Sequence, residues 1–264
     1  MMADSLKGKF PWRLGATSYV VPADLITNVL VLADQVDDIQ LLFFESAANS
    51  RLAHPVDVVG LQEIAADHAL TYTVHLPGDI RLGHEEIRIR RQGIDEIVRL
   101  MSELNALAPL CYDLHLHPEE LPEARWIDNL RWSLAELANR VGDAGERIAL
   151  ENTEIPPGLI MPFVEEYGFS FCFDVGHILR YGHDLQEAFR LLPRAGHIHY
   201  HAVRGERDHQ SLSLDDTSLT RNLFGEFLKI GYTQVLTLEV YAMKKLKHSM
   251  AVLETVWEQL NKEQ

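Results

Sequence analysis

The sequence predicts an α/β protein folded as a single (β/α)8 barrel, the TIM-barrel architecture. Short apolar runs alternate with amphipathic helical stretches, and eight such runs follow one another along the chain. The length of 264 residues also matches the roughly 250 residues that are usual for this barrel. No linker, low-complexity tract or long charged tail marks a second domain. We therefore expect one domain over residues 1–264.

The expected strands come first in the pattern, each followed by a helical or polar stretch. The first helical stretch, 22–36, opens with Pro22 and carries Asp24 in its first turn. The stretch 85–107 places apolar residues on one face and Glu and Arg on the other, and a further helix is expected at about 244–261. The segment 202–214 is too polar for the core and is the closest candidate for a lid. The expected strands are 13–20, 39–46, 71–77, 112–118, 147–154, 169–177, 197–203 and 235–241.

Alternation within these runs predicts which face of each strand lines the barrel. In 71–77, Tyr72 and Val74 share one face, while Thr73 and His75 share the other. Bulky apolar side chains must meet the surrounding helices, so the smaller and more polar face should point inward. Most runs also place an ionisable residue near the carboxyl end, where barrels of this kind keep their active sites.

The stretch 196–209, "GHIHYHAVRGERDH", fits this interpretation. His197, His199 and His201 alternate along an expected strand and so share a face. A solvated edge strand would explain one such column by itself. With the inward faces of the other strands also polar, we expect these histidines to line a shared pocket.

A metal site is the simplest use for so many inward-facing acids and histidines. Buried charges must be paired or bound to metal, because each costs several kcal/mol otherwise. Few Lys or Arg residues are available at the strand ends to neutralise Glu45, Glu151, Asp174 and Glu239. Mixed imidazole and carboxylate ligands suit zinc, manganese or iron. The alternative is a polar network with water-filled gaps.

The same residues carry a family resemblance. The ordered motifs "TVHLP", "LHLHP", "ALENT", "FDVGH", "HIHYH", "RDHQSL" and "TLEV" resemble the xylose isomerase-like barrel superfamily, in particular its endonuclease IV branch (AP endonuclease family 2). That resemblance implies three zinc ions. Asp208 immediately precedes His209, a spacing that departs from this branch and leaves the role of Asp208 open. The implied metal ligands are His75, His117, Glu151, Asp174, His177, His199, His209 and Glu239.

The size of this ligand set bears on the chemistry. Sugar isomerases and epimerases of the superfamily bind one divalent metal through two Glu, an Asp and a His, for which Glu151, Asp174, His199 and Glu239 would suffice. The additional histidines favour two or three metals, which can clamp the attacking and leaving oxygens of a phosphoryl displacement. We therefore expect a phosphodiesterase, with a sugar isomerase or epimerase as the alternative. Glu151, Asp208 and Glu239 are the candidate catalytic residues, Glu151 as the bridge between metals.

Composition limits the partners. A net charge of -15 disfavours nucleic acid, because binding to its phosphate backbone needs Lys and Arg. No segment reaches the roughly 20 apolar residues of a membrane span, and the N-terminal stretch has no apolar signal region, so we expect a cytoplasmic protein. Cys111 and Cys172 fit neither a disulfide framework nor a zinc motif, and we expect both to be buried fillers.

The substrate is expected to be a small molecule. The N-terminal stretch 13–46 resembles the cobamide-remodelling phosphodiesterases, which hydrolyse the phosphodiester in the nucleotide loop of vitamin B12-type corrinoids. An AP endonuclease acting on DNA and a metal-dependent binding protein are the less favoured alternatives. The oligomeric state stays open. Candidate substrate contacts at the pocket rim are Tyr19, Glu45, His115, His201, Arg204 and Tyr241.

Overall fold

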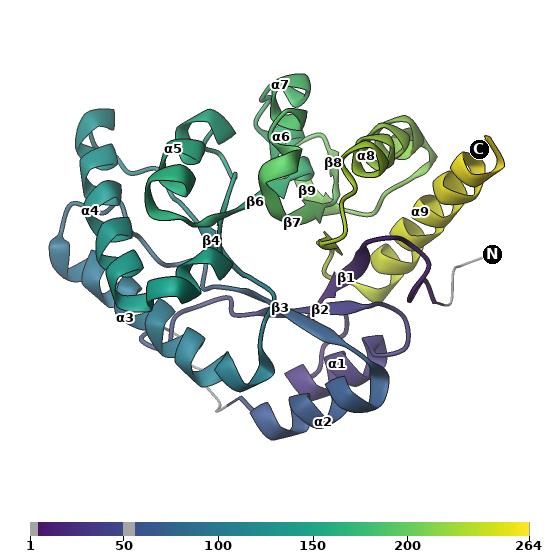
Figure 1. The fold of residues 1–264 in the computed structure, drawn as a ribbon, viewed down its shortest axis with the longest axis horizontal. Coiled ribbons are helices and arrows are strands. Elements are labelled where there is room, and N and C mark those ends of the chain that lie inside the picture. The colour runs from purple at the N-terminus through teal and green to yellow at the C-terminus, as the bar shows by residue number, and fades with distance from the viewer. Residues whose placement is uncertain (1–4, 50–55, 264) are drawn as a thin grey trace.

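The computed structural model describes residues 5–49 and 56–263. Eight parallel strands close into a barrel in the order β1-β10-β7-β6-β5-β4-β3-β2, with helices around the outside (Figure 1). This confirms the predicted fold class. The barrel strands are β1 (Arg13–Thr17), β2 (Asp38–Leu42), β3 (Thr71–His75), β4 (Tyr112–His115), β5 (Ile148–Glu151), β6 (Ser170–Asp174), β7 (Ala195–Tyr200) and β10 (Val235–Leu238).

The helices follow the predicted alternation; the expected helices 22–36 and 85–107 are shorter in the structure, and the one at about 244–261 is slightly longer. The first begins at Leu25 and not at Pro22, because the Asp24 side chain caps it by accepting the N–H of Thr27. The expected stretch 85–107 becomes one long helix followed by a short 3-10 turn. The α-helices are α1 (Leu25–Leu32), α2 (Val58–His68), α3 (Ile87–Leu104), α4 (Glu123–Val141), α5 (Pro157–Tyr167), α6 (Val175–Arg180), α7 (Leu185–Phe189), α8 (Thr217–Ile230) and α9 (Met243–Glu263).

The two faces of the strands separate as their alternation predicts. Large side chains such as Tyr72 and Phe171 belong to the extensive apolar core. Cys111, Ala149 and Cys172 form a separate small cluster of buried apolar residues, and their position on the opposite strand faces places it inside the barrel. Small apolar side chains therefore fill this part of the interior, and inward-facing polar residues such as Gln40 and Asp113 are buried as well.

The expected lid segment, 202–214, contains a small antiparallel hairpin beyond the end of β7. It consists of β8 (Ala202–Arg204) and β9 (Arg207–Gln210), whose pairing contains an irregularity. His209 has a φ of 48°, a left-handed conformation that is uncommon outside glycine. The backbone N–H of His209 donates to His201 Nδ1 at 3.0 Å, whereas Asp208 Oδ2 lies 4.0 Å from Arg180 Nε.

The register of the parallel strands brings the ionisable residues to one end of the barrel. His115 lies opposite Glu151, and Asp174 lies opposite His199. These pairs stand at or near the carboxyl ends of four consecutive strands.

Among the described residues, no helix is long and apolar enough to cross a membrane.

Candidate metal centre

Three neighbouring groups of side chains at the carboxyl end of the barrel could each hold a cation. In every group the potential ligand atoms lie within 4.8 Å of one another. The first ligand group is His75, His115 and Glu151. The second ligand group is Glu151, Asp174, His199 and Glu239, and the third is His177, His201 and His209.

The first ligand group has two imidazole nitrogens turned toward each other. His75 Nε2 lies 3.1 Å from His115 Nε2, and His115 Nε2 lies 3.2 Å from Glu151 Oε2. His75 Nδ1 is 2.8 Å from the carbonyl oxygen of Leu76, which only an N–H can satisfy, so its Nε2 carries the lone pair. Two nitrogens bound to one tetrahedral zinc ion stand about 3.3 Å apart. The spacing therefore suits two ligands of one ion.

The second ligand group is fully enclosed. His199 Nδ1 lies 3.3 Å from Glu151 Oε1, 3.5 Å from Glu239 Oε2 and 3.8 Å from Asp174 Oδ2. Glu151 thus presents Oε1 to this group and Oε2 to the first. A single carboxylate that faces two ligand groups with different oxygens has the arrangement of a bridging ligand.

The third ligand group comes from α6, the end of β7 and the hairpin. His209 Nδ1 is 3.2 Å from the carbonyl oxygen of Glu239, which leaves its Nε2 available as a ligand. His201 differs, because its Nδ1 accepts the backbone N–H of His209 at 3.0 Å. In the neutral ring the hydrogen then resides on Nε2, which faces Asp174 Oδ1 at 3.4 Å. His201 is accordingly better placed to donate a hydrogen bond than to bind a metal.

The chemistry of the buried atoms fits a cation. In the part of the chain that the structure describes, several inward-facing atoms are buried without a hydrogen-bond partner. Leaving such polar atoms unpaired costs about 1–3 kcal/mol each, and more for charged groups. A divalent ion would satisfy them together. These atoms include Glu151 Oε1 and Oε2, Asp174 Oδ2, His177 Nδ1 and Glu239 Oε2.

Local sequence explains how β5 and β6 hold their acids. The side chain of Asn152, in "ALENT", accepts the backbone N–H of Asp174 and donates to its carbonyl, both at 2.9 Å. Asp174 Oδ1 in turn caps α6 by accepting the N–H of His177 at 2.7 Å. Gly176 leaves the space that the His201 ring occupies, since a Cβ there would stand 2.1 Å from that ring. The motif "DVGH" therefore combines a cap, a close approach and two candidate ligands.

The electrostatics of the site couple the acids to the histidines. Burial by itself opposes ionisation of Glu151, but the imidazoles of His115 and His199 outweigh it and hold its pKa well below the ordinary value. Burial likewise disfavours the His177 imidazolium, yet Asp174 and Glu151 raise the His177 pKa to about 10. Without a cation, protons on histidine balance the carboxylates.

This balance predicts that metal uptake releases protons. A raised folded-state pKa means that protonated His177 stabilises the metal-free fold fully below pH 6.5 and that this contribution disappears as the pH rises through about 10. A metal ligand must be deprotonated, so metal affinity should rise with pH across the same interval. Titration calorimetry at pH 7 in two buffers of different ionisation enthalpy measures the released protons. His177→Asn should release fewer; equal heats in both buffers for the wild type would contradict this prediction.

The structure places the predicted ligands in these groups, apart from His117. His117 lies two residues beyond the end of β4, and among the described residues it joins none of the three groups. Burial, His115 and Arg81 lower its pKa to about 4. His115, which we expected at the substrate rim, takes the place beside His75 and Glu151, because it lies in register with Glu151 at the strand end.

The remaining predicted residues lie around the mouth. Tyr241 donates a hydrogen bond to Glu239 Oε1 at 2.9 Å. Tyr19 is partly exposed, and Glu45 lies exposed in the loop after β2. Arg204 pairs with Asp216 and donates to Ser213 at 2.9 Å on an exposed surface. Asp208 is half-buried, and its Oδ2 lies 4.0 Å from Arg180 Nε.

Sequence reasoning missed a buried polar tier beneath the ligand groups. His197 does not share the pocket of His199 and His201, because it lies deeper in the barrel and bonds to Asp113. The sequence pattern also gave no role to Gln40 or Phe44. The inward parity of Asp113 and Gln40 on their strands was the available signal.

Comparison with known proteins identifies the family. A family model described as "Xylose isomerase-like TIM barrel" matches residues 35–256, most of the chain. The chain belongs to the xylose isomerase-like TIM barrel family. The resemblance carried by the strand-end motifs is thereby confirmed at the level of the superfamily. No curated protein sequence gave a match.

Solved structures share the fold of this xylose isomerase-like barrel at low sequence identity. A D-tagatose 3-epimerase-like protein has a TM-score of 0.77 at 18% identity, covering 95% of this chain and 99% of its own. L-ribulose 3-epimerase has a TM-score of 0.70 at 18% identity, covering 95% and 97%. A 3-keto-D-glucoside 4-epimerase from E. coli has a TM-score of 0.70 at 14% identity, covering 93% and 98%. At these identities the likeness establishes the fold.

Proposed function

We propose that this protein is a metal-dependent phosphodiesterase that hydrolyses the nucleotide-loop phosphodiester of a cobamide. The observation that carries the metal chemistry is the position of Glu151, whose Oε2 is 3.2 Å from His115 Nε2 and whose Oε1 is 3.3 Å from His199 Nδ1. One carboxylate between two ligand groups supports at least two neighbouring metals. The ligand types suit zinc, with manganese or iron as alternatives.

Divalent ions bound by these groups would polarise a phosphodiester and lower the pKa of an attacking water. Side chains of this protein hold the ligand atoms in position. Glu151 holds the first and second ligand groups together, and Tyr241 Oη fixes Glu239 Oε1, which turns Glu239 Oε2 toward His199. His201 Nε2 presents a hydrogen-bond donor beside Asp174. Neither Asp208, predicted as a catalytic residue, nor Arg204, predicted as a substrate contact, is needed for this arrangement.

The choice of a corrinoid rests on the N-terminal resemblance and on charge. A net charge of -15 argues against duplex DNA as the substrate. The mouth is apolar beside the metal ligands: Tyr19 and Phe44, whose side chains are 44% and 56% exposed, meet edge to face with ring centroids 5.2 Å apart. Phe44 also packs edge to face against Tyr241. The centroid of the Tyr241 ring lies 4.9 Å from that of the His209 ring. Such a wall favours a substrate with a large apolar or planar part.

A divalent-metal sugar epimerase is the second candidate. Solved structures similar to this chain include proteins named as ketose and glycoside epimerases. The second ligand group alone has the two Glu, one Asp and one His that such enzymes use. An epimerase with one metal ion does not account for the first ligand group, His75, His115 and Glu151. Metal content separates the two, with one ion per chain for the epimerase and two or three for the phosphodiesterase.

The deciding experiment offers the metal-loaded protein three substrates. We expect cobalamin or its adenosylated form to be cleaved at the nucleotide-loop phosphodiester, with abasic-site DNA and free ketoses unchanged. Products are separated by chromatography, and the reaction should depend weakly on salt, because metal coordination and apolar contact replace cationic side chains. Nicked DNA with intact cobalamin would support a repair nuclease instead, and epimerised ketose with intact cobalamin would support the second candidate.

A further inference from the structure

His209 keeps an unusual backbone conformation through three hydrogen bonds to other parts of the barrel. Its φ of 48° lies in the left-handed region, where a residue other than glycine persists only if its surroundings require it. The backbone N–H donates to His201 Nδ1 at 3.0 Å, and the carbonyl oxygen accepts from Lys245 Nζ at 2.9 Å. The ring is held as well, since its Nδ1 is 3.2 Å from the carbonyl oxygen of Glu239.

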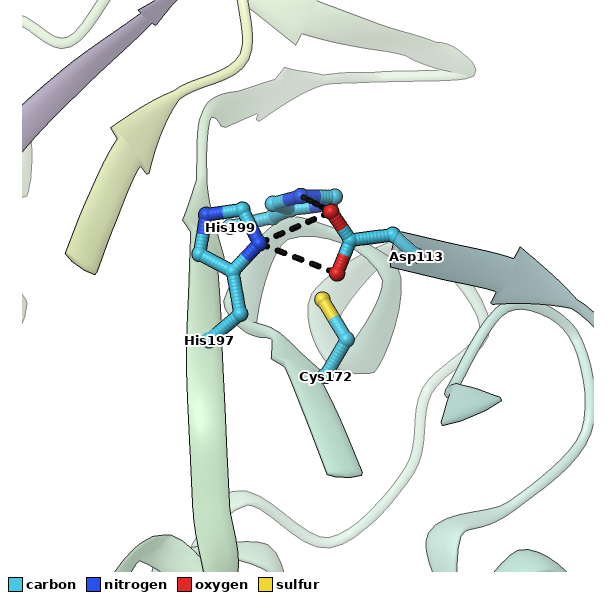
Figure 2. Close-up of side chains that lie close together, drawn as sticks. All are labelled: Asp113, Cys172, His197 and His199. Carbon is cyan, nitrogen blue, oxygen red and sulfur yellow. Dashed lines mark hydrogen bonds and ion pairs between the residues drawn. The ribbon is translucent and has the colours of Figure 1, made fainter. Parts of the chain in front are cut away.

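These contacts decide which ring nitrogen of His209 is available to a cation. A carbonyl oxygen can only accept, so in the neutral ring the hydrogen resides on Nδ1 and Nε2 carries the lone pair. His197, in the buried tier below, shows the opposite case (Figure 2): its Nδ1 bonds to Asp113 and its Nε2 lies 2.7 Å from Thr237 Oγ1, which leaves neither nitrogen free. His209 belongs to the third ligand group, and Nε2 is the nitrogen that it can offer there.

The backbone from His209 to Leu212 is anchored to α9 at two points. Lys245 donates to the carbonyl oxygen of His209, and Ser249 Oγ accepts the backbone N–H of Leu212 at 3.0 Å. Lys245 and Ser249 are four residues apart and therefore share one face of the helix. Pairing within the hairpin is irregular, so the helix supplies anchors that strand pairing alone does not.

We infer that Lys245 is a positioning residue: by holding the carbonyl of His209, it directs Nε2 of that ring toward an ion shared with His177. Without this contact, residue 209 can relax toward the extended conformation of a regular strand, which would turn the ring in another direction. The inference rests on the proposed function, because it requires one of the metal ions to occupy the third ligand group. Outer partners of a metal-bound histidine typically change metal affinity by about 10- to 100-fold.

The test compares two neighbouring lysines. Lys245→Met removes the hydrogen-bond donor and keeps most of the side-chain length. We expect the affinity for one bound ion to fall by about 10- to 100-fold, with the other ions bound as in the wild type, measured by stepwise competition between Zn²⁺ and a chromophoric chelator. Lys244→Met is the matched control, because it removes the same charge from an exposed residue. This control should keep the wild-type affinity for every ion.

A double-mutant cycle shows whether the effect passes through His209. His209→Asn removes the imidazole, and asparagine adopts the left-handed conformation more readily than most residues. In this background Lys245→Met should cause no further loss of metal affinity, because the ligand that Lys245 positions is already absent. An additional loss of the original size would overturn the inference, since Lys245 would then act through another group.

Other results would also decide against it. Wild-type affinity in Lys245→Met would overturn the inference, and so would an equal loss at every ion or in Lys244→Met, which would indicate a general effect of charge or stability. If Lys245→Met does not fold, as judged by near-ultraviolet circular dichroism, Lys245→Gln provides the same test with a side chain one atom shorter, and wild-type affinity there would overturn the inference. A wild-type protein that binds no metal would overturn the proposed function together with it.

Discussion

Replacing Glu151 by Gln is expected to reduce turnover by roughly 10³-fold or more, a loss on the scale seen when a central catalytic group is removed. The substitution preserves the volume of a completely buried side chain but removes the negative charge between the first and second ligand groups. An amide also cannot offer two anionic oxygens to two cations. Metal content should therefore fall in the same variant, while the barrel remains folded.

Glu154→Gln is the matched control for this prediction. Glu154 lies three residues further along the chain, and its side chain is exposed. The two variants make the same chemical change, so only the Glu151 variant should lose activity and metal. Steady-state rates and elemental analysis of both proteins measure the difference. Wild-type turnover in Glu151→Gln would remove Glu151 from the mechanism.

Removing the metal with a chelator is expected to abolish turnover and to lower the thermal midpoint. Three buried carboxylates, Glu151, Asp174 and Glu239, then depend on the neighbouring histidines alone for compensating charge. A ligand present at 100 times its dissociation constant stabilises the folded state by about 2.7 kcal/mol, which corresponds to roughly 5–10 °C for a chain of this size. Differential scanning calorimetry with and without added Zn²⁺ measures this shift.

Readdition of metal gives the stoichiometry that distinguishes the two candidate functions. We expect activity to return in step with two or three ions per chain, as both the first and second ligand groups fill. Restoration of full activity by a single ion would favour the epimerase instead. Retention of activity in the thoroughly chelated protein would contradict metal dependence altogether.

Much of the fold could be predicted from local pattern. The run 71–77 contains β3, and 112–118 contains β4, because alternating side chains on a buried strand must separate large apolar groups from small polar ones. The same alternation is sufficient to predict that His75, Glu151 and Asp174 point inward. Strand ends were predicted less well, since where pairing stops depends on neighbouring strands and not on the run itself.

The choice between histidines of equal parity was beyond the sequence. His115 and His117 both face inward by alternation, yet only His115 lies in register with Glu151. His197, His199 and His201 likewise share a face, but the closed barrel assigns them to three surroundings: the buried tier, the second ligand group and the hairpin. Local periodicity specifies a direction for each side chain and carries no information about its depth.

The sequence by itself determined the barrel, the inward position of the acids and histidines, and membership of a metal-associated superfamily. The tertiary structure alone decided which atoms meet. Asp113 and His197 are 84 positions apart, and Gln40 and His199 are 159 apart, so their contacts exist only once the barrel closes. Closure fixes the stagger of each strand against the next, and that stagger sets which side chains share a level.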